Sequence, residues 1–334
     1  MPPANGREGR EPVRSIGIML LALVAWVCGG TVGASAAYPD RPVKVLVGFP
    51  PGTAADTTTR LLAPALGDLL GQSIVVENKS GASSTIAVDA VVHAQPDGYT
   101  LFMGTVSNTV NPALIKDLPF NYETDLAPVA LVGTVPNLLV VHPSVAAKSV
   151  AELVALAKTR PGQITYGSAG TGTILHLSGE LFNATAGIKL LHVPYKGSSQ
   201  AMTDLLGGQI ATMFAPVSTA LPHVRAGTIR ALATTGATRT PVLPDLPTMM
   251  ELGYTGFVTG VWCGLMAPKA TPRDVIDRLA AAVARAQASP GVAGPFAAQG
   301  IDVLHGGPDV LGRMIHDETI KWAGVLQRAG VHKD

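Results

Sequence analysis

A buried strand, a tight turn of small residues and a helix follow one another twice in this chain. This repeated unit restricts the fold more than any other feature. Residues 43–47 are apolar and rich in valine, the pattern breaks at residues 50–52 (Pro-Pro-Gly), and leucines recur at helical spacing over residues 61–70. The same order recurs over residues 164–184, around the glycine-rich stretch 167–173. Two such units predict two similar α/β halves.

The turn of each unit is suited to an anion. The first N–H groups of a helix have no partner inside the helix, and the helix dipole places a partial positive charge at the same end. A carboxylate or another anion is therefore favoured above such a turn. We expect the two turns to face each other and to form one anion site between the two halves.

The rest of the chain alternates between strand and helix patterns, which predicts open parallel sheets of the α/β class. Ligands bind beyond the carboxyl ends of such strands. The segments 105–109 and 215–218 each follow a predicted strand, and we expect both to be loops at this rim.

The C-terminal part has strands and helices of its own but no glycine-rich turn, so we expect it to return and complete the first half. The predicted organisation is a discontinuous first domain, residues 37–138 with 236–334, and an inserted second domain, residues 139–235. Two crossing hinge segments join them.

Composition excludes several classes of protein. The chain has 334 residues, of which 47% are hydrophobic and 14% charged, and its formal net charge is +1. Because there is no cluster of Lys and Arg, we expect no nucleic-acid partner. There is no His pair at zinc-ligand spacing with a carboxylate and no Walker loop, so we expect neither a metal nor a cofactor.

The N-terminus has the pattern of a secretory signal. Three arginines precede an apolar segment, residues 16–27, and the small residues 34–36 (Ala-Ser-Ala) suit a cleavage site. We expect residues 1–36 to be a signal peptide cleaved near Ala36; an uncleaved N-terminal anchor is the alternative. The remaining chain has one cysteine, Cys263, and therefore no internal disulfide. An exported chain without disulfides suits the bacterial periplasm.

A set of short motifs occurs in a fixed order along nearly the whole exported chain. They are Tyr38-Pro39-x-Arg41-Pro42, Phe49-Pro50-Pro51-Gly52-x-x-x-Asp56, Val76-Glu77-Asn78, Pro96-Asp97-Gly98-Tyr99-Thr100-Leu101, Tyr166-Gly167-Ser168-Ala169-Gly170-x-Gly172-Thr173, Val193-Pro194-Tyr195-Lys196-Gly197, Ala220-Leu221-Pro222-His223 and Leu243-Pro244-Asp245-Leu246-Pro247-Thr248. Together with the signal peptide, this set resembles the Bug family, the extracytoplasmic solute receptors of tripartite tricarboxylate transporters.

The resemblance implies a two-lobed periplasmic binding protein of type II, the Venus flytrap arrangement. Such a protein closes on a small carboxylate and delivers it to a membrane permease, although members without a dedicated permease are known. We expect a monomer that binds a di- or tricarboxylate or an aromatic acid. A receptor that senses its ligand for a signalling partner is the alternative.

The expected ligand-binding residues come from both turns and from the neighbouring rim. They are Phe49, Pro51, Gly52, Thr53, Ala54, Asp56, Thr105, Ser107, Asn108, Ser168, Ala169, Gly170, Thr171, Gly172, Thr173, His176, Tyr195, Lys196, Gly197 and Ala215. Some have a second interpretation. Asp56 lies in a first helical turn, where a carboxylate interacts favourably with the helix dipole even when no ligand is bound. His176 is also explained by packing or by helix capping, and Lys196 by a position on the solvated surface.

Two positions depart from the family pattern. Thr53 stands where a second glycine is usual, which narrows the backbone freedom of the turn but adds a hydroxyl donor. Ala215 and Pro216 stand where a polar pair such as Asp-Asn is frequent. Without an acidic residue there to pair with an ammonium group, an amino-acid ligand is disfavoured and a carboxylate without an amine is favoured.

A serine hydrolase is the enzymatic alternative. Residues 166–170 have part of the G-x-S-x-G pattern around Ser168, but Tyr166 stands in place of the first glycine. Asp204 and His223 are candidate partners, although nothing in their spacing fixes a triad. We therefore expect a binding protein rather than an enzyme.

Overall fold

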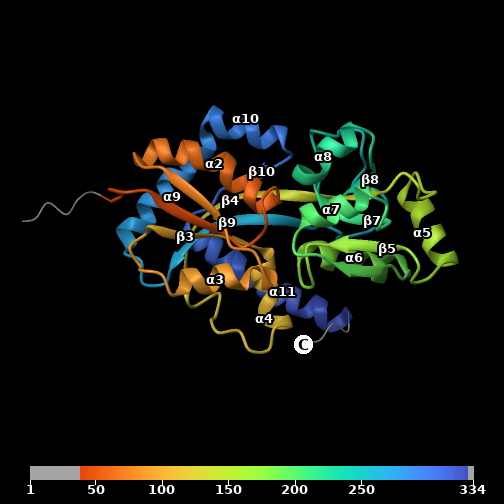
Figure 1. The fold of residues 1–334 in the computed structure, drawn as a ribbon, viewed down its shortest axis with the longest axis horizontal. Helices are drawn as coiled ribbons and strands as arrows, with labels where there is room; N and C mark the ends of the chain where they lie inside the picture. The colour runs from red at the N-terminus through yellow and green to blue at the C-terminus, as the bar shows by residue number, and fades with distance from the viewer. Residues whose placement is uncertain (1–37, 330–334) are drawn as a thin grey trace, which may run out of the picture. The chain divides into compact units, whose positions relative to one another are not determined.

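The structure is a computed structural model that describes residues 38–329. The predicted signal peptide, residues 1–36, lies outside the described residues. The helices and strands treated below all belong to one compact unit, Arg41–Asp334 (Figure 1).

The first lobe is built on a mixed sheet in the order β2-β1-β3-β9-β4, with the short β10 paired to β4. Its strands are β1 (Val43–Val47), β2 (Ile74–Asn78), β3 (Thr100–Thr105), β4 (Leu126–Val141), β9 (Gly260–Pro268) and β10 (Asp302–Val303). β1 runs parallel to β2 and β3, whereas β9 is antiparallel to both β3 and β4. A fully parallel sheet was expected, but only β1, β2 and β3 are parallel to one another.

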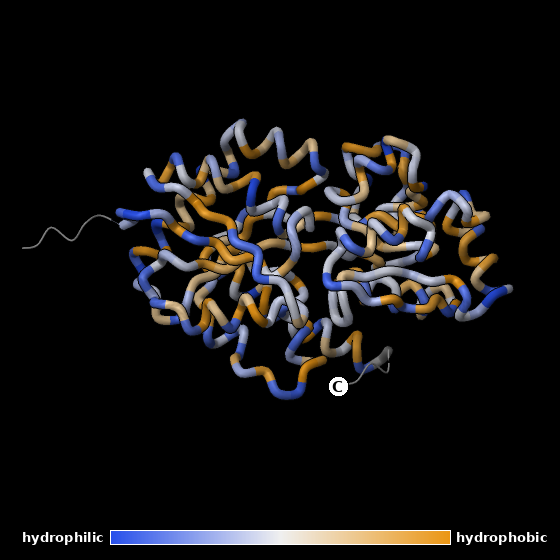
Figure 2. The backbone as a smooth tube through the Cα atoms, viewed as in Figure 1, coloured by the Kyte–Doolittle hydropathy of each residue, from blue (hydrophilic) through white to orange (hydrophobic). Residues whose placement is uncertain are grey.

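The helices of this lobe are α2 (Ala54–Leu70), the short 3₁₀ turn η1 (Ala82–Ser84), α3 (Thr85–Val92), α4 (Val106–Leu114), α9 (Arg273–Ala288), α10 (Pro290–Ala298) and α11 (Pro308–Ala329). α2 packs against α9 and α10, and α11 packs against α4 and β4. The C-terminal elements therefore complete the lobe that the N-terminal elements begin. Figure 2 shows that hydrophobic residues gather on the strands and on the inward faces of these helices.

The second lobe is built on β5 (Thr165–Ser168), β6 (Leu191–Pro194), β7 (Thr212–Pro216) and β8 (Arg230–Thr234), together with the distal half of β4. β5 runs parallel to β6 and β7, and β4 is antiparallel to β7 and β8. Its helices are α5 (Val150–Thr159), α6 (Ile174–Ala186), α7 (Ser198–Leu206) and α8 (Val217–Arg225). Phe182, Phe214 and Phe257 form an aromatic group in its core.

β4 connects the two lobes, because its first half pairs with β9 and its second half with β7 and β8. Where β4 crosses, the Thr235 N–H donates to the Asn137 carbonyl at 2.8 Å. The boundaries 139–235 and 236–334 stay a prediction. Met249 and Phe257, which that prediction assigns to the first domain, pack with Phe182 in the second lobe.

Two segments expected as rim loops are helix starts instead. α4 begins at Val106, directly after β3, and Thr105 with Asn108 forms a capping box there. α8 begins at Val217, directly after β7. The chain turns from strand to helix without an intervening loop at both places, so the backbone N–H groups of two further helices reach the rim.

Candidate functional site: a cavity ringed by helix N-termini

Segments from both lobes surround one small cavity of about 30 Å³. That is room for only a few water molecules. Seven of the predicted site residues line it: Phe49, Thr53, Ala54, Thr105, Ser107, Ala169 and Thr173. Ala55, Ile174, Leu175, Ser198, Pro216 and Val261 line it as well. None of these thirteen side chains is charged.

Most of the lining residues lie at or next to the N-termini of five helices. Ala54 and Ala55 open α2, Ser107 lies in the first turn of α4, and Ile174 and Leu175 open α6. The other two N-termini are those of α7, which begins at Ser198, and α8, which Pro216 precedes. The N-cap residues of α2, α6, α7 and α8 supply no side-chain hydrogen bond that caps their own helix. Each of these four helices therefore directs uncapped N–H groups and the positive end of its dipole to the same region. At α4, Thr105 and Asn108 form a capping box, so that only part of its N-terminus is free.

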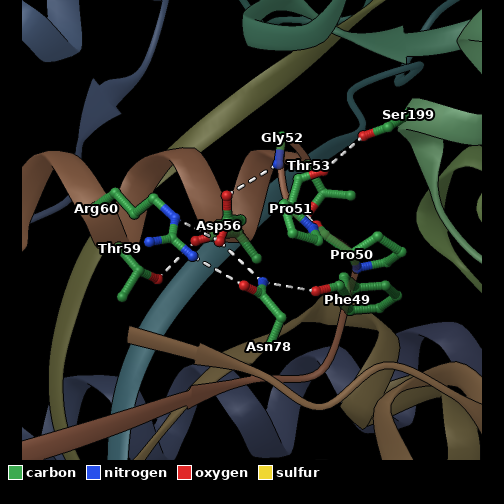
Figure 3. Close-up of polar contacts among 11 residues, drawn as sticks. Phe49, Pro50, Pro51, Gly52, Thr53, Asp56, Thr59, Arg60, Asn78 and Ser199 are labelled. Atoms are coloured by element: carbon green, nitrogen blue, oxygen red, sulfur yellow. Dashed lines mark hydrogen bonds and ion pairs between the residues drawn. The ribbon is translucent and has the colours of Figure 1, made fainter. Parts of the chain in front are cut away.

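The first turn is held in shape by Asp56 (Figure 3). This carboxylate is 3% exposed and accepts hydrogen bonds from the Gly52 N–H at 2.9 Å, the Asn78 amide at 2.8 Å and the Arg60 Nε at 2.9 Å. The Gly52 backbone has φ +77°, which glycine adopts without strain. The Asp56 side chain thus fixes the turn from behind, and neither Asp56 nor Gly52 is among the residues that line the cavity.

The second turn is also internally bonded. The Ser168 hydroxyl contacts Gly170 and lies 2.7 Å from His192 Nε2. The Gly172 N–H donates to His176 Nδ1 at 3.2 Å. Ser168 is fully buried, as is most of His176. Of the predicted residues of this turn, Ala169 and Thr173 reach the cavity wall, and Ser168, Gly170, Thr171, Gly172 and His176 support or flank it.

The histidines beneath this turn are packed face to face. The rings of His176 and His192 stack with centroids 4.1 Å apart, and His192 also stacks on Tyr166. Burial lowers the pKa of His176 to about 4, and burial with the neighbouring His176 lowers the pKa of His192 to about 4. Burial and the hydrogen bond to Glu180 raise the pKa of Tyr166 above its usual range. Both histidines are neutral near pH 7.

The geometry around Ser168 does not match the expected hydrolase partners. Asp204 accepts a hydrogen bond from the Tyr195 hydroxyl at 2.7 Å, and His223 lies in the last turn of α8. Ser168 contacts His192 instead, and its hydroxyl is also bonded to the backbone of its own turn. A fully buried serine bonded in this way holds the turn together.

The remaining predicted residues lie around the cavity. Asn108 is buried and accepts the Thr105 N–H at 2.9 Å, and Ala215 is buried in β7. Burial, with the hydrogen bond to Asp204, raises the pKa of Tyr195 to about 12. Lys196 is exposed to solvent, as is Pro51.

The two lobes touch through their turns. The Ser199 hydroxyl donates to the Pro51 carbonyl at 3.1 Å, as Figure 3 shows, and the Ser83 hydroxyl donates to the Thr171 carbonyl at 3.1 Å. Gly197 is so close to Pro50 that a methyl group on it would lie 2.7 Å from the proline ring. These contacts join opposite sides of the cavity and hold it closed.

Sequence reasoning missed six of the lining residues. Ala55, Ile174 and Leu175 are neighbours of predicted residues, so the helix-start pattern was a sufficient signal for them. Ser198 begins α7 in a stretch that was expected to be a loop, Pro216 precedes α8 in the segment 215–218 that was expected to be a rim loop, and Val261 is an ordinary apolar residue of β9. Nothing local in the sequence marks Val261 as a lining residue.

Within residues 38–329, no three His, Cys, Asp or Glu side chains gather as a metal would require. Over the same residues, no helix has the length and hydropathy of a membrane span.

This arrangement defines a class of protein: two α/β lobes, joined by crossing strands, that enclose a site at their helix N-termini. Solved structures of periplasmic binding proteins have the same fold. An R. palustris protein solved with adipate is 34% identical to this chain, covers 89% of it and all of its own length, and superposes with a TM-score of 0.86. MatC from Rhodopseudomonas palustris, solved with bound malate, is 33% identical, covers 86% of this chain and all of its own length, and has a TM-score of 0.81.

Sequence comparison gives the same result. Residues 58–331 match the profile of the tripartite tricarboxylate transporter family receptor. Protein BugT of Bordetella pertussis is 40% identical over 295 residues, which are 88% of this chain and 90% of BugT. The chain belongs to the tripartite tricarboxylate transporter receptor family, as its resemblance to the Bug proteins predicted.

Proposed function

We propose that this protein is a periplasmic receptor that closes its two lobes on a small carboxylate, which the N-termini of α2, α4, α6, α7 and α8 hold. The observation that carries the proposal is the convergence of these five N-termini on one cavity with no charged side chain in its wall. Without an Arg or Lys to bind a carboxylate, main-chain N–H groups and hydroxyls perform that role.

The two lobes supply matching donors. The N–H groups of Ala54 and Ala55 and the Ser107 hydroxyl come from the first lobe, and Ser198 with the first N–H groups of α6 comes from the second. A carboxylate has acceptor positions for several donors at once. A ligand that bonds to both sides stabilises the closed form over the open one, which couples binding to closure.

Ligand entry requires the lobes to separate. A dicarboxylate several carbons long needs far more room than the present 30 Å³. The crossing strand β4 and the segment that leads from β8 to β9 are continuous between the lobes and supply the hinge. The turns at Pro51 and Thr171, whose carbonyls accept the cross-lobe hydrogen bonds, part as it opens.

The ligand class is narrowed by the cavity wall and by the relatives. Phe49, Ile174, Leu175 and Val261 give the wall an apolar side that suits a carbon chain or an aromatic ring. Two similar structures were solved with adipate and with malate. We therefore infer a di- or tricarboxylate, or an aromatic acid, as the ligand of this chain.

Membership of the family supports a proposal for the cellular setting. We infer that residues 1–36 are cleaved near Ala36 during export, that the mature receptor works as a monomer in the periplasm, and that it delivers its ligand to a tripartite tricarboxylate permease. The mass of the exported protein and its gel-filtration volume test the first two inferences. Loss of carboxylate uptake on deletion of the gene tests the third, and normal uptake would favour a sensing role.

A thermal-shift screen of the mature protein against adipate, malate, citrate and benzoate tests the binding function. A true ligand at about 100 times its dissociation constant should raise the free energy of unfolding by about 2.7 kcal/mol. Calorimetry on Ser107→Ala with Ser198→Ala should then show a loss of affinity. Ser289→Ala, which removes a hydroxyl between α9 and α10, is the matched control. If no carboxylate stabilises the protein, the proposal fails.

A further inference from the structure

Asn137 is the one fully buried side chain in the crossing part of β4 whose polar atoms are both unpaired within residues 38–329. It is 0% exposed, and neither its Oδ1 nor its Nδ2 has a hydrogen-bond partner among those residues. Its backbone, by contrast, is fully bonded: the Asn137 N–H donates to Thr235 Oγ1 at 3.0 Å, and its carbonyl accepts the Thr235 N–H at 2.8 Å. Buried amides are rarely left unpaired, because the lost hydration is costly.

The register of the sheet gives the direction of this side chain. Asn137 lies directly opposite Pro216 in β7, and Val135 lies directly opposite Val261 in β9. Opposed residues of antiparallel strands project from the same face, and residues two apart on one strand do so as well. Pro216 and Val261 both line the cavity between the lobes. The Asn137 amide therefore points toward that cavity from just behind its wall.

A second unpaired polar group lies near Pro216, the residue opposite Asn137. Ser218, in the first turn of α8 and two residues after Pro216, has a buried hydroxyl with no partner in the described part of the chain. Two buried and unpaired polar groups, the Asn137 amide and the Ser218 hydroxyl, thus lie behind the cavity wall next to Pro216. A ligand that enlarges the cavity on this side reaches polar groups that the closed, small cavity leaves unbonded.

We propose that Asn137 determines ligand specificity by binding a hydroxyl group of the captured acid, so that the preferred ligand is a hydroxycarboxylate. A hydroxyl can accept from Nδ2 and donate to Oδ1 of one amide at the same time. A carboxylate or a keto oxygen only accepts, so it would leave Oδ1 unpaired. This inference rests on the proposed carboxylate-binding function and adds a partner for the hydroxyl group of the ligand, whose carboxylate the helix N-termini hold.

Malate and succinate test the proposal, because they differ by one hydroxyl. We expect the mature protein to bind malate at least about tenfold more tightly than succinate in titration calorimetry. Asn137→Leu, which has a similar volume but no polar atoms, should bind the two equally and keep its affinity for succinate within about threefold. Asn137→Ala should also bind malate and succinate with equal affinity. It replaces Asn137→Leu in this test if the leucine variant does not fold.

Thr212→Val is the matched control, since it removes a buried hydroxyl that is already bonded to the Val140 carbonyl in the second lobe. It should keep the preference for malate. Equal binding of malate and succinate by the unaltered protein, or a preference that persists in both Asn137 variants, would overturn the proposal while carboxylate binding stands. If the unaltered protein binds no carboxylate at all, the proposed function fails and this inference fails with it.

Discussion

Gly197→Ala should weaken ligand binding by blocking closure while leaving the separated lobes unaffected. Gly197 precedes α7 in the second lobe with φ −175° and ψ 163°, an extended backbone that any residue adopts. An added Cβ would lie 2.7 Å from Cδ and 2.9 Å from Cγ of Pro50 in the first lobe. Carbon atoms prefer about 3.5–4.0 Å, so the two turns would have to separate by about 1 Å.

The size of the effect follows from that overlap. Overpacking of this kind costs about 1–3 kcal/mol, which corresponds to an affinity about 5- to 150-fold weaker. Titration calorimetry with the carboxylate that binds best gives the dissociation constant. Thermal unfolding without ligand should change by less than about 1 °C, because Gly197 meets Pro50 only when the lobes are together.

Two further variants make this test specific. Gly307→Ala is the control, since a Cβ there meets nothing within 4 Å. Pro50→Ala removes the ring carbons that the new methyl group meets, so the double variant with Gly197→Ala should recover most of the lost affinity. An affinity for Gly197→Ala within twofold of the unaltered protein would refute closure at this contact.

Three other predictions concern the turns. Ser199→Ala removes the cross-lobe hydrogen bond to the Pro51 carbonyl and should weaken binding about 2- to 10-fold by stopped-flow or calorimetric titration; a stronger complex would contradict this role. Asp56→Ala removes an acceptor for three donors and should lower the free energy of unfolding by about 2–3 kcal/mol in urea, whereas a change below about 0.5 kcal/mol would show that the turn does not depend on it. Burial lowers the pKa of His176 to about 4 from an ordinary 6.5. Between these two pH values the imidazole is protonated in the unfolded chain and not in the folded chain. The free energy of unfolding therefore falls as the pH drops through this window, and at pH 5 it should be about 2 kcal/mol lower than at neutral pH. Urea titrations of the protein and of His176→Gln should differ in this slope, and parallel curves would contradict the argument.

Local chemistry accounts for the parts of the fold that could be predicted from the sequence. The valine run of β1, the Pro-Pro-Gly break and the leucine spacing of α2 are all local signals, and so are the glycines before α6. The prediction located both turns because glycine and proline mark them directly.

The parts that were missed depend on pairing between distant segments. α4 and α8 begin directly after β3 and β7 with no loop between strand and helix, and the cap of α4 uses Asn108 where Glu or Gln is the usual signal. β4 continues through Pro136 because its pairing changes there from β9 to β7, which no local pattern shows. The direction of the Asn137 side chain, toward the cavity, also follows from this strand register. Which N-termini meet at one cavity is therefore a property of the topology.

A crystal structure of the mature protein with the carboxylate that binds best would show directly whether helix N-termini hold the ligand. We predict a carboxylate group between the lobes, within hydrogen-bond distance of the N–H of Ala54 or Ala55 on one side and of the start of α6 or α7 on the other. A ligand bound outside this cavity, or held there by a Lys or Arg side chain, would contradict it.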